Sequence, residues 1–223
     1  MENIKLFVDG AWRPGSSGRS LAIFDPATGK TIGRVAIAEE EDLDAALEAS
    51  AIGFSRWRSV PSFQRYKLLR KAANNIRDAA EVTAKRMTLE QGKPLAEAKA
   101  EVLAAADIID WAAEEGRRAY GRMIPSRAAN VTQAMAPQPV GPVIAFTPWN
   151  FPMNQPVRKV AAALAAGCSI IIKGSEETPC SLVAIVSAFD AAGLPRGVLN
   201  AVFGIPDQIS SYLIASPIVQ KIS

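Results

Sequence analysis

Short apolar runs and longer periodic segments alternate in the last third of the chain. Val143–Phe146 and Ser169–Lys173 are runs of the kind that forms strands buried on both faces. Between them, apolar residues recur at helical spacing from Val157 to Ala165, and Gly167 is placed to end that helix. The pattern predicts a strand–helix–strand unit, and an open parallel sheet places its ligands at the loops that follow the carboxyl ends of such strands.

The same alternation continues to the end of the sequence. It predicts a helix, a strand, a second helix and the start of one more strand, over residues 179–192, 198–203, 206–215 and 219–223. The expected fold class is therefore α/β, with an incomplete, Rossmann-like, doubly wound parallel sheet. An N-terminal layer of strands and helices precedes it.

That N-terminal layer has two parts. Extended segments come first, with a strong hairpin signal at Asp9-Gly10, and we expect these strands to pack as a cover on the helices behind them. Helical periodicity then dominates from Glu40 to Tyr120. The second helix is expected to open at Pro61 and to keep one inner face as far as Ala80.

Proline-rich composition between residues 122 and 142 interrupts the periodicity, which favours an extended, edge-like arm. The chain is thus divided into residues 1–121, which hold the N-terminal strands and the helical layer, the arm 122–142, and a half-domain over 143–223. An unpaired arm of this kind is an aggregation liability.

Composition narrows the possible functions. The net charge is +3 over 223 residues with both signs interspersed, which gives no support for a nucleic-acid or membrane partner. No signal peptide or long apolar span is visible, so a cytoplasmic location is expected. The chain has no histidine, and its two cysteines lack metal or redox spacing, so we expect no metal site and no Ser-His-Asp triad.

Several ordered motifs resemble one family. They are T-P-W-N-F-P, A-A-L-A-A-G-C and K-G-S-E-E-T-P, with L-E-Q-G-K-P-L-A-E-A-K-A-E-V and E-E-G-R-R-A-Y-G upstream. Together they resemble the NAD(P)-dependent aldehyde dehydrogenases, closest to the succinate-semialdehyde dehydrogenase branch, over the N-terminal half of that family only. The resemblance implies oxidation of a small aldehyde or semialdehyde to the acid, and a homo-oligomer in the complete enzyme. In that family the arm joins an oligomerisation sheet with a strand from the far C-terminus.

Asn150 is the sharpest catalytic candidate. A side-chain amide held in a tight loop can donate to the oxyanion that forms when a thiolate attacks an aldehyde, and the resemblance makes Asn150 the family's oxyanion asparagine. The alternative is an asparagine that only bonds its own turn backbone. The P-W-N-F-P context favours the functional interpretation.

Lys173 and Glu176 leave the carboxyl end of a predicted strand with opposite charges. In the family such a pair holds the adenosine ribose, and a carboxylate there repels a 2′-phosphate, which favours NAD over NADP. Glu177 keeps the local charge negative. The alternative is a solvated surface ion pair, which contributes little. Gly204 is expected to let the backbone approach the adenine, although Pro206 stands where the family has another glycine.

Arg158 lies eight residues after Asn150 on the following helix. In the succinate-semialdehyde branch an arginine there binds the far carboxylate of the substrate, while the alternative is a solvated face shared with Lys159. The resemblance also places Thr147 and Trp149 in the cofactor pocket. The alternative for Trp149 is a core aromatic residue.

The remaining reactive groups have simpler interpretations. Cys168 is expected to be a small buried hydrophobe, and Cys180 opens a helix, where modest reactivity is conceivable. Residues 90–93, Glu-Gln-Gly-Lys, are expected to form a helix end and a solvated surface.

The family's nucleophilic cysteine, its general-base glutamate and its pyrophosphate-binding turn all correspond to positions beyond Ser223. We therefore expect these 223 residues to be inactive alone and to bind NAD weakly. The alternatives are a non-catalytic nucleotide-binding or assembly module, a truncated relative, or a fragment of a longer reading frame.

Overall fold

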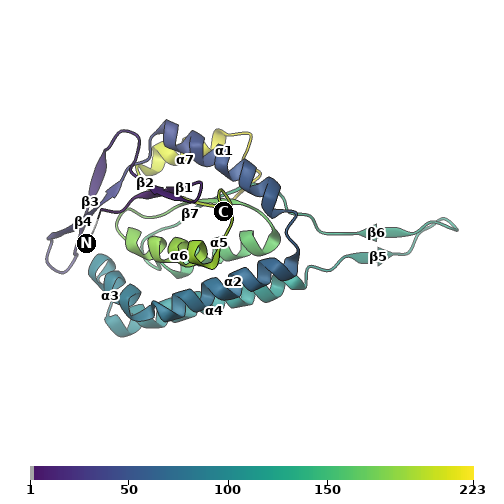
Figure 1. Cartoon of the computed structure of the whole chain (residues 1–223), viewed down its shortest axis with the longest axis horizontal. Helices are drawn as coiled ribbons and strands as arrows, with labels where there is room; N and C mark the ends of the chain where they lie inside the picture. Colours follow the sequence, from purple (N-terminus) through teal and green to yellow (C-terminus); the bar gives the residue numbers. More distant parts are fainter. Residues whose placement is uncertain (1–2) are drawn as a thin grey trace.

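The computed structural model describes residues 3–223 as a layered α/β body with one projecting arm (Figure 1). The strands are β1 Leu6–Val8, β2 Ala11–Arg13, β3 Ser20–Phe24, β4 Thr31–Ala36, β5 Arg122–Ile124, β6 Gln133–Met135, β7 Val143–Phe146, β8 Ile170–Lys173, β9 Leu199–Val202 and β10 Lys221–Ile222. The helices are α1 Glu40–Trp57, α2 Ser62–Asp78, α3 Ala80–Gln91, α4 Leu95–Arg117, α5 Asn154–Ala166, α6 Pro179–Ala192 and α7 Pro206–Ala215.

A six-stranded sheet in the order β10-β7-β8-β9-β1-β2 forms the centre of the body. The four strands from β10 to β9 are parallel, and β1 joins β9 in the antiparallel direction. Because β8 and β9 lie on one side of β7 and β10 lies on the other, the strand order reverses at β7. This is the topology of a doubly wound sheet, as the sequence predicts.

The first two strands differ from the prediction. The expectation that they cover the helices is wrong for β1 and β2, which extend the central sheet, whereas β3 and β4 form a separate two-stranded sheet. Asp9 and Gly10 both have positive φ in the predicted hairpin turn, at 51° and 71°. The Asp9 N–H donates to Asn200 Oδ1 at 3.0 Å and helps to fix the hairpin beside β9.

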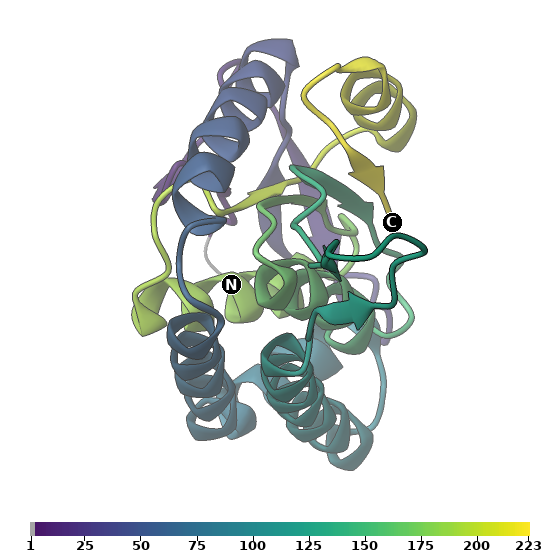
Figure 2. The same ribbon diagram turned by 90° about the vertical axis from the view of Figure 1, so that its right-hand side faces the viewer.

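Helices cover both faces of the sheet (Figure 2). One face carries α1 and α7. The other carries α5 and α6, and α2, α3 and α4 pack beneath these two as a further layer. The predicted second helix is interrupted, since α2 ends at Asp78 and α3 begins at Ala80.

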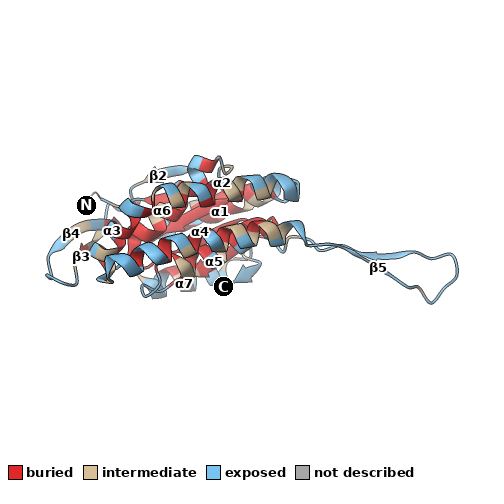
Figure 3. Cartoon of the chain, turned by 90° about the horizontal axis from the view of Figure 1, so that it is seen from below, coloured by how far each residue is buried: buried red, intermediate tan, exposed pale blue. Residues whose placement is uncertain are grey.

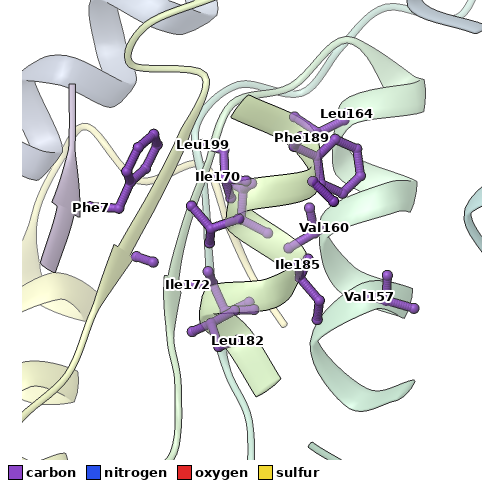
Figure 4. Packing of buried hydrophobic residues seen from close by; sticks show 14 of the residues in the cluster. Phe7, Val157, Val160, Leu164, Ile170, Ile172, Leu182, Ile185, Phe189 and Leu199 are labelled. Atoms are coloured by element: carbon purple, nitrogen blue, oxygen red, sulfur yellow. The ribbon is translucent and has the colours of Figure 1, made fainter. Parts of the chain in front are cut away.

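The main core lies between the sheet and the α5–α6 layer (Figure 4). Ile170 and Ile172 of β8 face Val160 of α5 and Ile185 of α6, and all four side chains are almost fully buried. Apolar residues at helical spacing on the two helices make this packing possible. The core therefore fixes where β7 and β8 end, and with them the loops that follow.

The segment from 122 to 135 leaves the body as a two-stranded hairpin, and its strand residues are all exposed (Figure 3). Within residues 3–223, β5 and β6 pair only with each other. The prediction of an extended arm is confirmed, and the division into domains at 121 and 142 stays a prediction.

Candidate functional site

A cleft of about 450 Å³ opens where β7 and β8 end, beneath the start of α7. Its lining includes Thr147 and Trp149 from the loop after β7, and Lys173 and Glu176 from the end of β8. The cleft lies at the carboxyl ends of parallel strands, where α/β sheets bind their ligands. Four of the predicted site residues are thus brought together.

Lys173 and Glu176 form an ion pair, with Lys173 Nζ 2.7 Å from Glu176 Oε2. Both side chains are largely buried, with 7% and 13% of their surfaces exposed, so the pair is not the solvated one of the alternative interpretation. The second carboxylate oxygen, Glu176 Oε1, accepts a hydrogen bond from Gly204 N–H at 2.8 Å. Gly204, at φ 140°, therefore contributes to the site by holding Glu176.

Thr147 links the two strand ends. Its N–H and its hydroxyl both donate to the Lys173 carbonyl oxygen, at 3.2 and 3.4 Å. Trp149, two residues later, is 54% exposed at the edge of the cleft and is not a core aromatic residue.

Asn150 is exposed in the same loop but does not line the cleft. Its Oδ1 accepts from the Phe151 N–H at 3.1 Å, which is the local bond of the alternative interpretation. Its carbonyl oxygen is approached by Gln91 Nε2 at 3.4 Å and by Lys93 Nζ at 3.5 Å. Contacts from the end of α3 and the segment after it thus hold the backbone of this loop.

Arg158 lies elsewhere. It is exposed on α5 and lines a second cavity of about 470 Å³, together with Lys159, Lys221 and Ser223. Lys159 Nζ also lies 3.2 Å from Ser223 Oγ. The structure therefore does not bring Arg158 into the cleft with Lys173 and Glu176.

Sequence reasoning missed Glu101, which supports the Asn150 loop through hydrogen bonds to its backbone. This glutamate of α4 is buried, and its Oε1 accepts the N–H groups of Met153 and Asn154 at 2.9 and 3.1 Å. Its other oxygen pairs with Lys93 Nζ. The N-cap residue of α5 makes no side-chain hydrogen bond, so Glu101 accepts from N–H groups that the start of α5 would otherwise leave unsatisfied.

Glu90 plays the same part for α6. Its carboxylate accepts from the N–H groups of Cys180 and Ser181 at 2.8 and 2.9 Å, and from the Ser181 hydroxyl at 2.7 Å. Burial raises the pKa of the Glu90 carboxyl to about 7, although the hydrogen bonds from Ser181 and Cys180 act in the opposite direction. The expectation of a solvated surface is thus wrong for Glu90.

The structure also corrects the expectation for Cys180. Burial, reinforced by the neighbouring Glu90 charge, raises the pKa of this thiol well above its usual range. Since the thiolate is the reactive form, Cys180 is a poor nucleophile at neutral pH. Cys168 is buried at the start of β8, as expected.

Residues 3–223 lack two kinds of feature. No group of three His, Cys, Asp or Glu side chains in this part of the chain could hold a metal ion. None of its helices is both long and apolar enough to cross a bilayer.

Comparison with known proteins identifies the family. Residues 12–223 match the aldehyde dehydrogenase family. Over 219 residues the chain is 44% identical to a 4-(hydroxymethyl)benzenesulfonate dehydrogenase of Comamonas testosteroni, covering 98% of this chain and 46% of that protein. It is 38% identical to the succinate-semialdehyde dehydrogenase (NADP(+)) of Escherichia coli strain K12, covering 98% and 45%.

Solved structures agree with this assignment. An E. coli NADP dependent enzyme superposes with a TM-score of 0.97 at 37% identity, over 99% of this chain and 46% of that one. A 3,6-anhydro-L-galactose dehydrogenase in complex with NAP gives 0.94 at 31% identity, over 99% and 46%. The chain spans about half the length of the curated relatives it matches. It therefore belongs to the aldehyde dehydrogenase family, whose members use NAD(P).

Proposed function

We propose that these residues form the cofactor-binding part of an NAD-dependent aldehyde or semialdehyde dehydrogenase, which oxidises its substrate to the acid. The observation that carries the proposal is the buried Lys173–Glu176 pair at the carboxyl end of β8, inside the cleft. A nucleotide that enters this cleft meets a fixed cation that is paired with a fixed carboxylate.

The available hydrogen-bonding groups fit an adenosine ribose. Each oxygen of Glu176 accepts one bond, from Lys173 or from Gly204, and a carboxylate oxygen can accept a second from a ribose hydroxyl. Lys173 uses one of its three N–H donors for Glu176, so others can face the ligand. The bound dinucleotide would supply the hydride acceptor for aldehyde oxidation.

The carboxylate also favours NAD over NADP. A free 2′-hydroxyl can donate to Glu176, whereas a 2′-phosphate brings negative charge against it. One relative is named for NADP(+) and one solved neighbour holds NAP, so both cofactor types occur among similar proteins. Glu176 therefore supports the proposal that the complete protein uses NAD.

Titration calorimetry with AMP tests the cofactor assignment on this chain directly. We expect one AMP to bind per chain, and Glu176→Ala to weaken binding by about tenfold, because ribose hydrogen bonds to a carboxylate are lost. The matched control is Glu115→Ala, which removes an exposed carboxylate on α4 that does not line the cleft. Absence of AMP binding to the parent chain would contradict the assignment.

Asn150 is proposed to stabilise the oxyanion of the reacting aldehyde. The bond from Phe151 N–H occupies the amide oxygen, and the Nδ2 group has no acceptor among residues 3–223. A chimera of this segment with the remaining half of a relative tests this role. Asn150→Ala is expected to lower its kcat about 10²–10³-fold, and unchanged turnover would contradict it.

Arg158 is proposed to bind an acidic group on the substrate. Arg158, Lys159 and Lys221 gather positive charge around their cavity. The names of the relatives point to substrates that carry an acidic group away from the reacting carbon, since they include a benzenesulfonate, a sulfolactaldehyde and the succinate and glutarate semialdehydes. In the same chimera, Arg158→Ala should raise KM for succinic semialdehyde and leave KM for an uncharged aldehyde little changed.

These 223 residues are proposed to be inactive alone. Both thiols are buried, and the raised pKa of Cys180 disfavours its thiolate. A dehydrogenase assay with NAD and succinic semialdehyde should therefore give no turnover, and turnover at a normal enzymatic rate would refute this statement.

Self-association is a second proposal, supported by the exposed arm. Met123, Ile124 and Met135 present apolar side chains to solvent on β5 and β6. A homo-oligomer that pairs or covers this hairpin would bury them. Sedimentation analysis of the parent chain and of a variant with residues 122–135 replaced by a short glycine–serine link should show association only in the parent.

A further inference from the structure

The cleft contains a second carboxylate besides Glu176. Glu177 and Ser175 line the same cavity as Lys173 and Glu176. The Ser175 hydroxyl donates to the Glu177 carboxylate and accepts from the Glu177 N–H at 3.3 Å. These two bonds hold the Glu177 side chain close to its own backbone at the wall of the cleft.

The two carboxylates differ in how their charge is compensated. Glu176 is paired with the Lys173 ammonium at 2.7 Å, so much of its charge is neutralised. No lysine or arginine of residues 3–223 forms an ion pair with Glu177, whose carboxylate is held by a neutral hydroxyl. Lys173, Glu176 and Glu177 are the charged residues of the lining, so the cleft carries a net charge of −1, which resides on Glu177.

We infer that Glu177 is a second specificity-determining residue, which disfavours a 2′-phosphate on the adenosine ribose, while Glu176 mainly binds the ribose. This inference rests on the proposed function of the cleft. A phosphate monoester carries almost two negative charges at neutral pH, so an uncompensated carboxylate nearby opposes it more than a neutralised one does. Removal of Glu176 alone would then leave much of the preference for a ribose without a 2′-phosphate in place.

The test compares two ligands, AMP and adenosine 2′,5′-bisphosphate, by calorimetry on the full chain and on Glu177→Gln. In the variant we expect the dissociation constant of the bisphosphate, divided by that of AMP, to fall by about five- to tenfold. The shift should shrink as the salt concentration rises from about 0.05 to 0.5 M, because ions screen the charge of exposed groups. A merely structural role for Glu177 would not depend on salt in this way.

Two further variants make the result specific. Glu176→Gln should weaken the binding of AMP, since it removes the charged partner of the ribose, and Glu115→Gln should leave the ratio as it is in the parent chain. If AMP binds and the ratio in Glu177→Gln equals that of the parent, this inference is wrong and the proposed function stands. If AMP does not bind the parent chain at all, both are wrong.

Discussion

The loops after β7 and β8 lead into helices that are capped in the same unusual way but with different electrostatics. Glu101 caps α5 after the Asn150 loop, and Glu90 caps α6 after the loop of Glu176. Both glutamates come from the helical layer and are buried, with 5% and 3% exposure. Glu101 has a cationic partner in Lys93, whereas Glu90 is held by N–H and hydroxyl donors and pairs with no cation among the described residues.

The two caps therefore differ in how the buried charge is compensated. An opposite charge at hydrogen-bond distance favours the charged form of a buried carboxylate. Without such a partner, burial dominates, and the pKa of Glu90 is raised to about 7. The loop that carries Asn150 is therefore supported by a charge that Lys93 compensates, and the loop that carries Glu176 by one that titrates near neutrality.

The largest expected effect is that of Glu101→Ala. It removes the acceptor of two N–H groups and leaves the Lys93 ammonium without its carboxylate, so we expect a loss of about 3–5 kcal/mol in the free energy of unfolding. Urea denaturation monitored by circular dichroism measures it. Glu81→Ala breaks the exposed pair with Lys99 and should change stability little. Equal losses in the two variants would contradict the structural role of Glu101.

The second prediction concerns pH. The folded chain binds the Glu90 proton more tightly than the unfolded chain, because the pKa of Glu90 is raised from its ordinary value of 4.5 to about 7. The contribution of Glu90 to the free energy of unfolding therefore falls as the pH rises from 4.5 to about 7. The difference in stability between the parent chain and Glu90→Gln should decline by about 3 kcal/mol over that range and stay level above it. Denaturation curves between pH 4.5 and 8 test this, and a difference that rises with pH would reverse the assignment.

A third variant would make the α5 cap resemble the α6 cap. Lys93→Met keeps the length of the side chain but removes the cation, which leaves Glu101 buried beside neutral donors only. We expect a loss of about 2 kcal/mol in the free energy of unfolding, because the buried carboxylate loses its cation. The same denaturation assay applies, and an unchanged stability would show that Lys93 does not support this cap.

The smallest effect is expected for Gln91→Ala. Its side chain reaches the Asn150 carbonyl at 3.4 Å, a long bond at the surface. Its removal should cost about 0.5 kcal/mol or less in the free energy of unfolding, measured by the same urea denaturation. A loss as large as that of Lys93→Met would mean that Gln91 and not the buried pair holds the loop.

The two capping glutamates also mark the limit of what the sequence predicts. Apolar spacing predicts α4 correctly, and Glu101 lies within its buried stripe, between Ala98 and Val102. Glu90 likewise follows Thr83 and Met87 on the inner face of α3. In both helices, the available signal was a charged residue at an inward position. The partner Met153 lies 52 residues from Glu101, however, and Cys180 lies 90 residues from Glu90, and local periodicity contains no information about such distant partners.

The cleft could be predicted from the sequence more fully than the two caps. Thr147 directly follows one buried strand and Lys173 ends the next, so parallel pairing of the two strands brings these residues together, as observed. The position of Arg158 depends on which way its helical face turns, and the structure directs it to another cavity. The antiparallel addition of β1 to the sheet could not be foreseen either, because three apolar residues fit a covering strand as well as an inner strand of the central sheet.

That addition of β1 has a consequence for how the protein is made. Phe7 pairs with Ala201, so β1 meets its neighbour β9 only after the long intervening stretch of chain has also been translated. At a synthesis rate of about 5–20 residues per second, that interval is roughly 10–40 s. Throughout the interval Leu6, Phe7 and Val8 lack the β9 side of their burial site, so this segment is exposed to chaperones and to association with other unfolded chains.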